Sequence, residues 1–424
     1  MIIESLVPWR ARPNFRLDAT SAALSGVYGG GIFPFVAFVA RDHLHASAAE
    51  LGLMTAAPFV GNLLALPFTH IVSRGQPVRN VALMIAIARV MLVGASFATG
   101  SAVFAWTVFA VQCLASIPTP TYISIIRLIY PLEYLGRMLS YTRVLMAAGM
   151  ILSTFSAGWM IDRWGWRPVF LAFAPVGLAA LALYSRIRIP ADQPVTRHNE
   201  MIEFTKGAFG LLRQDIPFRW FALAVSVYGF GNLMAVPVYT IYQVDVLHIT
   251  ASWVAILMNI TQVVWMLSYV FWARYIDSVS PLKLVMINTA VAAIMPLNYL
   301  VAFEVWMLVP FAVVGGIVNA GIELSYFNSV MHFSTPENSA QYQAMHSLLL
   351  GVRGIIGPFA GAAMARSLID SGGDIRWVFA VSGILILAGA VLQRPGMRHP
   401  VKRSGGWRSE SEPERRTEDT TESD

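Results

Sequence analysis

The amino-acid sequence predicts an all-helical membrane protein whose twelve transmembrane helices form two pseudo-symmetric six-helix halves. Three observations support this fold class. Of the 424 residues, 56% are hydrophobic and only 13% are charged, about half the roughly 25% that is usual in soluble domains. The apolar residues fall in twelve long runs, and short motifs recur about half a chain apart. This pattern excludes an ordinary soluble protein, and a single cysteine, Cys113, excludes a disulfide scaffold.

Each predicted span is about 20 residues long, which matches the apolar core of a bilayer, about 30 Å thick. The runs are continuously apolar instead of alternating, and a helix satisfies its backbone hydrogen bonds within its own segment. The first run is longer than a signal-peptide core and is predicted to be an uncleaved anchor. The predicted spans are 18–40, 49–71, 80–99, 103–127, 142–161, 168–186, 218–240, 251–273, 283–303, 306–330, 344–366 and 376–393.

Polar segments divide the chain into four predicted parts. Residues 1–186 form the N-terminal half and residues 218–393 form the C-terminal half. Between them, 187–217 is rich in polar residues and is predicted to be a cytoplasmic linker. The end of the chain, 394–424, is first basic and then acidic and rich in Ser and Thr, so we expect a disordered cytoplasmic tail.

The distribution of Lys and Arg predicts the orientation. If both termini lie on one side, 23 of the 30 basic residues fall on that side, including Arg143 at the start of the fifth span, and 5 fall on the other. Cytoplasmic segments carry the excess of positive charge. Both termini are therefore predicted to be cytoplasmic, in the inner (cytoplasmic) membrane of the cell.

An internal repeat supports the two-half organisation. Ser73–Arg79, between spans 2 and 3, aligns with 277–283 between spans 8 and 9, where a proline and a basic residue recur at the same spacing. Arg167–Phe170 before span 6 aligns with Arg376–Phe379 before span 12. These matches fall in equivalent loops, as expected for transporters built from two related halves.

On these features the chain resembles the major facilitator superfamily over residues 18–393. That family carries Gly-x-x-x-Asp-Arg-x-Gly-Arg-Arg between spans 2 and 3; here Ser73 takes the aspartate position. A related signature follows span 5, from Gly158 to Arg167. The resemblance implies a functional monomer and a loop aspartate that helps to latch one conformation. The gating-loop candidates it implies are Arg74, Arg79, Asp162, Arg163, Asp277 and Lys283.

Ionisable residues deep in a span are functional candidates because a charge is costly in hydrocarbon. Glu323 lies in span 10, which lines the central cavity in this family, and shares a helix face with Asn319 and Tyr326 by its spacing. We expect Glu323 to handle a proton or cation. The alternative is a static ion pair with an arginine, such as Arg353 in span 11.

Other candidates line the predicted spans. Arg353 either binds an anionic substrate or neutralises Glu323, and His346 lies one heptad earlier. Arg89 lies in span 3. The sequence favours an Arg89 that pairs or snorkels near the cytoplasmic face, and the alternative is contact with the substrate. The polar lining candidates are Asn232, Asn259 and Gln262, each of which alternatively bonds a neighbouring helix.

The predicted function is secondary active transport of a small solute by alternating access, coupled to a proton or ion gradient. The alternative is a membrane sensor or scaffold that binds without transporting. No phosphate-binding Gly-x-x-x-x-Gly-Lys-Ser/Thr loop or common hydrolase motif occurs, so we predict no enzyme activity. The predicted partners are a small-molecule or ion substrate and the lipid bilayer, without nucleic acid, cofactor or metal.

Overall fold

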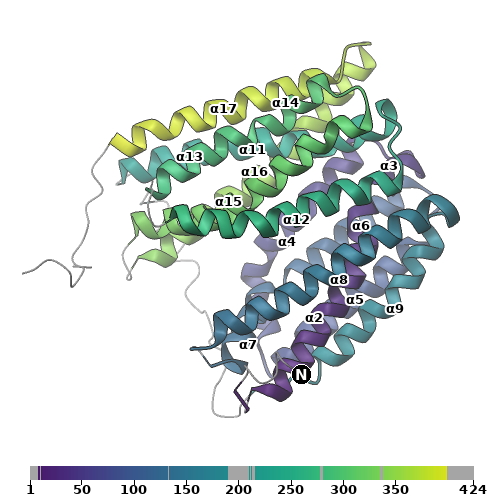
Figure 1. The fold of residues 1–424 in the computed structure, drawn as a ribbon, viewed down its shortest axis with the longest axis vertical. Coiled ribbons are helices and arrows are strands. Elements are labelled where there is room, and N and C mark those ends of the chain that lie inside the picture. The colour runs from purple at the N-terminus through teal and green to yellow at the C-terminus, as the bar shows by residue number, and fades with distance from the viewer. Residues whose placement is uncertain are drawn as a thin grey trace, which may run out of the picture.

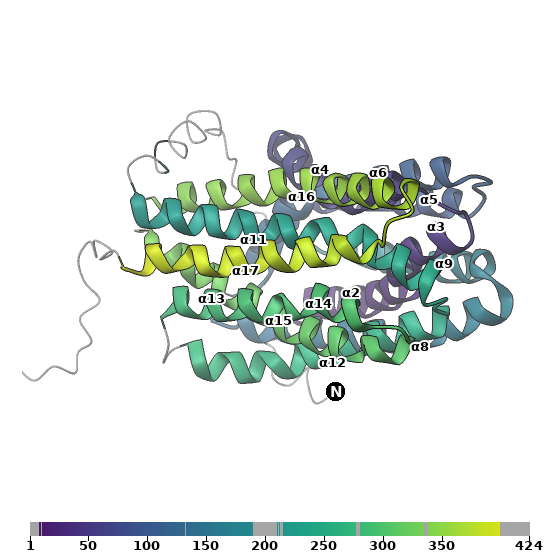
Figure 2. The same ribbon diagram turned by 90° about the horizontal axis from the view of Figure 1, so that it is seen from above.

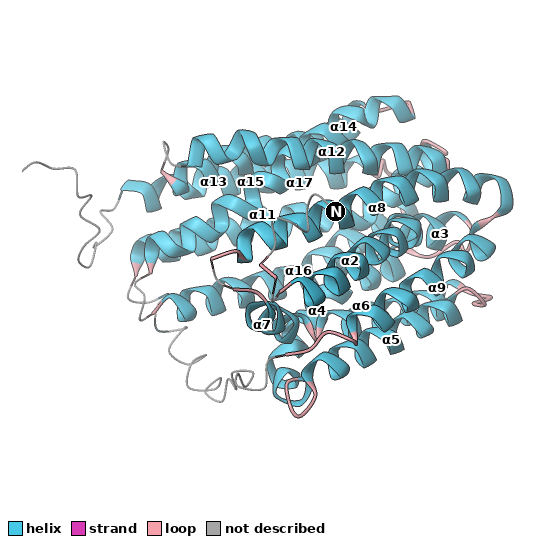
Figure 3. Ribbon diagram, turned by 60° about the horizontal axis from the view of Figure 1, so that its bottom comes forward, coloured by secondary structure: helices cyan, strands magenta, loops and turns pink. Residues whose placement is uncertain are grey.

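The structure, a computed structural model, describes residues 8–9, 11–131, 133–189, 210, 212, 215–276, 280–334 and 338–398. Across these described residues the regular structure is helical, without strands (Figure 3). Twelve helical segments are long and apolar enough to cross a membrane. Each overlaps one of the twelve predicted spans, so the predicted fold class is confirmed.

The first six spans precede the linker. Their elements are α2 (Arg12–Ile32), η1 (Phe33–Phe35), α3 (Val36–Asp42), α4 (Ala48–Val72), α5 (Pro77–Ala95), α6 (Ser101–Ser116), α7 (Thr119–Ile129), α8 (Leu135–Trp164) and α9 (Trp166–Tyr184). The fourth span is divided between α6 and α7. Pro118 lies at this break and Pro120 in the first turn of α7. Proline has no backbone N–H to continue the helical hydrogen bonds, which explains the break.

The last six spans follow the linker. Their elements are α11 (Ile216–Ile241), η2 (Tyr242–Val246), α12 (Ala251–Ile276), α13 (Pro281–Ala292), α14 (Ile294–Val301), η3 (Val305–Leu308), α15 (Val309–Phe333), α16 (Ser339–Asp370) and α17 (Arg376–Arg398). The η2 segment is a single π-helical turn that extends α11.

Some helix ends differ from the prediction because hydropathy marks only the apolar part of a helix. The α8 helix begins at Leu135 instead of 142, so Arg143, at the start of the predicted span, lies well inside the helix. The α17 helix continues to Arg398, so the first residues of the predicted tail are helical. The remaining tail, 399–424, and most of the linker lie outside the described residues.

The surface of the helices is apolar over wide areas. Leu152, Leu267 and Ile384 are each more than 60% exposed, and Trp106 and Trp159 are also exposed. Soluble proteins rarely show such extensive apolar surface, whereas a lipid-facing surface requires it. The chain is therefore a multi-pass membrane protein.

The helices before the linker form one bundle and those after it form a second (Figures 1 and 2). We call the side of the molecule where α9 ends and α11 begins the linker side, and the opposite side the far side. In Figure 1 the two bundles meet near α3, on the far side, and diverge toward the linker side. The bundles contact each other mainly through α4 against α16 and α8 against α12.

Candidate functional site

The structure brings three predicted residues of the C-terminal half together around Arg353. This arginine is only 7% exposed and lies between α16 and α11, where its guanidinium donates a hydrogen bond to the carbonyl oxygen of Val225. Arg353 also lies near the side chains of Tyr326 and His346. The rings of Tyr326 and His346 are 5.3 Å apart and nearly perpendicular. These residues form a cluster in which Tyr326 and Arg353 are buried and His346 is half-buried.

Glu323 is not part of this cluster. Its side chain and that of Asn319 are exposed, whereas Tyr326, three residues after Glu323, is buried. Glu323 lies beside Tyr269 of α12, and Arg143 of the other half is close enough to act electrostatically on that tyrosine. Among the described residues Glu323 has no ion pair, so its pairing with Arg353 is not seen.

The three polar lining candidates differ in their surroundings. Asn259 donates a hydrogen bond of 3.1 Å to the carbonyl oxygen of Ile151 and so joins α12 to α8 across the two halves. Asn232 and Gln262 are half-buried and have no hydrogen bond within the described part of the chain. These two side chains therefore keep free donors and acceptors.

Arg89 does not extend toward the membrane surface. Its guanidinium donates to the carbonyl oxygen of Gly177 and, over 3.2 Å, to the hydroxyl of Ser25, and lies 4.6 Å from the ring centroid of Tyr28. These contacts draw α5 toward α2 and α9. Arg89 thus faces the interior of the N-terminal half.

A cavity of about 260 Å³ lies beside Arg89, between α2, α5, α6, α7, α8 and α9. Its lining includes two charged residues that the sequence did not identify as site residues, Asp18 and Arg143. Asp18 is 2% exposed and accepts a hydrogen bond of 2.6 Å from the hydroxyl of Tyr130. A carboxyl at the start of the first span was the signal in the sequence, but the cavity itself depends on how six helices pack.

Asp162 connects the two halves on the far side. Its carboxylate accepts the backbone N–H groups of Ala251 at 2.8 Å and Ser252 at 2.9 Å, the first residues of α12. A carboxylate at this position accepts hydrogen bonds from backbone N–H groups that have no partner within α12. The positive end of the helix dipole also stabilises its negative charge. Four residues earlier, Gly158 packs against Ala251 and Ala255.

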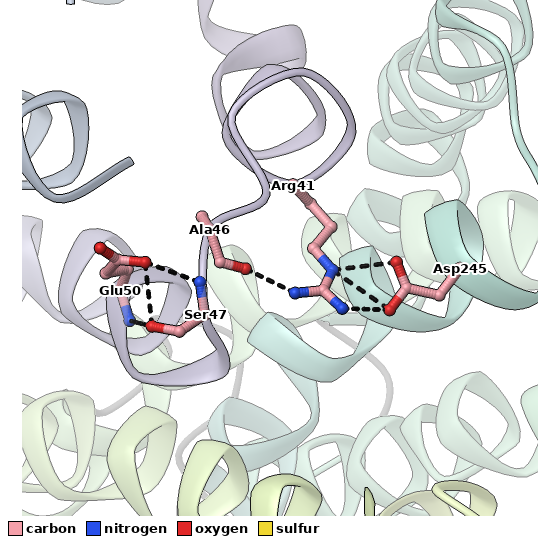
Figure 4. A network of polar contacts seen from close by, with 5 residues as sticks. All are labelled: Arg41, Ala46, Ser47, Glu50 and Asp245. Atoms are coloured by element: carbon pink, nitrogen blue, oxygen red, sulfur yellow. Dashed lines mark hydrogen bonds and ion pairs between the residues drawn. The ribbon is translucent and has the colours of Figure 1, made fainter. Parts of the chain in front are cut away.

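A second far-side connection joins Arg41, at the end of α3, to Asp245 in η2 (Figure 4). Two nitrogens of the guanidinium contact the carboxylate, and a third donates to the carbonyl oxygen of Ala46. The next residue, Ser47, forms a capping box with Glu50 at the start of α4. One ion pair thus links the loop between the first two spans to the other half.

The remaining gating-loop candidates lie apart from these connections. Arg163 is exposed and lies 6.0 Å from the ring centroid of Trp159. On the linker side, Arg74 and Lys283 are exposed, and Arg79 donates to Gln76. Asp277 lies outside the described residues.

Comparisons with known proteins agree with this architecture. A family model described as Major Facilitator Superfamily matches residues 19–358 and 267–418. A 65-residue segment is 38% identical to "Multidrug resistance protein B homolog" of Mycobacterium tuberculosis. That segment covers 15% of this chain and 12% of the relative, so the likeness is local.

Solved structures resemble most of the chain. The nucleoside transporter NupG is 14% identical, with a TM-score of 0.74 over 91% of this chain and 100% of that one. A bacterial homologue of the human lysosomal transporter Spinster, in an inward-facing conformation, is 15% identical, with a TM-score of 0.68 over 92% and 98%. A D-xylose–proton symporter is 12% identical, with a TM-score of 0.65 over 90% and 96%. At these identities the likeness concerns the fold.

Proposed function

Because the chain belongs to the Major Facilitator Superfamily, we propose that it is a secondary active transporter, which moves a small solute by alternating access between its two halves. The observation that carries this proposal is the position of the contacts between the halves. Asp162 and Arg41 join the halves on the far side, while the bundles diverge on the linker side (Figure 1). Contacts that close one side at a time are what alternating access requires.

We further propose that Glu323 couples transport to a proton or ion gradient. Glu323 lies ten residues from the linker-side end of α15, which corresponds to a depth of about 15 Å. An exposed carboxylate without an ion pair at this depth is available to bind a cation. Tyr269 beside it supplies a hydroxyl to the same place.

This proposal predicts gradient-driven uptake that depends on Glu323. Vesicles containing the protein, with an acidic outside and a mixture of small metabolites, should accumulate at least one of them, as measured by mass spectrometry. Glu323→Gln should abolish this accumulation, because the glutamine amide has nearly the shape of the glutamate side chain but cannot bind and release a proton during transport. Glu304→Gln, an exposed glutamate in a far-side loop, is the matched control and should transport normally.

The outcomes separate the alternatives. Normal coupling in a folded Glu323→Gln variant would remove Glu323 from this role. Binding of a metabolite without any uptake would favour the sensor or scaffold function over transport.

We also propose that the linker side is cytoplasmic in the inner membrane, that the protein works as a monomer, and that the halves are residues 1–186 and 218–393. The excess of Lys and Arg in linker-side segments supports this orientation. A cysteine replacing Arg188 should therefore react with a membrane-impermeant maleimide only after the cells are opened. Reaction in intact cells would show that the linker side faces outward and would contradict the proposed orientation.

A further inference from the structure

The cavity in the N-terminal half contains more positive than negative charge. Its lining includes the guanidinium groups of Arg89 and Arg143 and a single carboxyl, that of Asp18. With all three groups ionised, the formal charge of the lining is +1. A positive charge inside a membrane-spanning bundle is costly unless it has a partner or a function.

The carboxyl of Asp18 makes no direct ion pair with either arginine, although Arg143 is close enough to act on it electrostatically. Asp18 accepts its hydrogen bond from Tyr130, and within the described residues it forms no ion pair. Arg89 contacts neutral groups, namely a carbonyl oxygen, a hydroxyl and an aromatic ring. Arg143 is exposed and forms no hydrogen bond or ion pair with described residues. Both guanidinium groups therefore keep donors for a ligand, since each carries five N–H groups.

The rest of the lining supplies hydroxyl groups and apolar surface. Hydroxyl groups come from the lining residues Ser21, Ser25, Thr119, Tyr122, Thr142 and Tyr184. The apolar lining residues are Ala22, Ile85, Ala115, Pro118, Met146 and Leu181. Apolar walls with a few placed polar groups are typical of sites for small molecules.

We propose that this cavity binds a small organic anion with one negative charge, which Arg89 and Arg143 hold by charge-assisted hydrogen bonds. The planar guanidinium fits carboxylate-like groups better than a lysine ammonium does. A single negative charge balances the formal +1 of the lining. The inference rests on the proposed transport function and adds the chemical class of the solute.

The test uses charged thiol reagents and needs no knowledge of the solute. Thr119 lines the cavity and is exposed, so a Thr119→Cys variant places a thiol there. The native Cys113 is buried and donates to the carbonyl oxygen of Ala57, and Cys113→Ser keeps that donor. The protein is placed in nanodiscs of neutral phosphatidylcholine. The two probes are sulfonatoethyl and trimethylammonioethyl methanethiosulfonate, each compared with its rate on a free thiol.

The anionic probe should react about tenfold faster than the cationic one after this correction, because a positive cavity concentrates anions. Arg143→Gln, which removes no hydrogen bond of the described residues, should lower the ratio severalfold, and the double variant with Arg89→Gln should bring it close to one. Arg137→Gln is the matched control, because Arg137 is exposed on the same helix but does not line the cavity.

Equal rates for the two probes in the parent protein would overturn the proposal. A preference that persists in the folded Arg143→Gln variant and is the same as in Arg137→Gln would also overturn it. Because labelling requires only the cavity, a clear preference in a protein that shows no uptake would retain the anion site and reject transport.

Discussion

Gly158→Leu is expected to separate the two halves on the far side. A Cβ atom at this position would lie 2.7 Å from the Cβ of Ala255 and 2.8 Å from the carbonyl oxygen of Ala251, both in the other half. Overpacking of this kind costs about 1–3 kcal/mol. The far-side-closed population should therefore fall roughly 5- to 150-fold relative to the open one.

Spin labels on opposite halves measure this change. Thr99 and Ser371 lie in exposed far-side loops, and cysteines at both positions in the Cys113→Ser background carry the labels. Double electron–electron resonance should show a longer distance between the two labels in Gly158→Leu. The control is Gly136→Leu on the same helix, where no atom lies within 4 Å of the added Cβ and the separation should not change. An unchanged separation in both variants would refute tight far-side packing.

Gly30→Leu is expected to destabilise the N-terminal half. A Cβ atom on Gly30 would lie 2.7 Å from the hydroxyl of Thr154 and would overlap Met150 and Ser153 of α8. Overpacking by about 1–3 kcal/mol should lower the midpoint of thermal unfolding by about 2–12 °C. Tryptophan fluorescence on heating, with gel filtration of the sample, measures this.

The neighbouring glycine provides the control. The nearest side-chain atom to a Cβ on Gly29 is a ring carbon of Phe33, at 3.6 Å, which is an ordinary contact. Gly29→Leu should leave the unfolding midpoint within about 2 °C of the wild type. If both variants unfold alike, the packing of Gly30 against α8 does not set the stability of this half.

The twelve spans were predictable because hydropathy reports directly on burial in lipid. The ends of the helices were less predictable. Before Arg143, the first turns of α8 carry Arg137, Ser140, Tyr141 and Thr142, which lower the apolar character although the backbone is already helical. Arg143 was consequently counted with the surface charges of the cytoplasmic side, and one of the two positive charges of the cavity was missed.

The partners of the buried charges were not predictable from spacing alone. Helical periodicity placed Asn319, Glu323 and Tyr326 on one face, yet Tyr326 contacts the Arg353 cluster while Glu323 is exposed. Which of these side chains is buried depends on how α15 packs between α12, α13 and α16. Similarly, the motif after the fifth span indicated that Asp162 matters, but its partners, two backbone N–H groups of the other half, are defined only in three dimensions.

Alternating access requires the two halves to move against each other, and the linker-side separation in Gly158→Leu tests this movement most directly. Glu133 and Ser280 are exposed on the linker side of the two halves and can carry spin labels as cysteines. If opening the far side closes the linker side, the distance between these labels should become shorter in Gly158→Leu than in Gly136→Leu. A far side that opens while the linker-side distance stays the same would contradict alternating access by rigid-body movement.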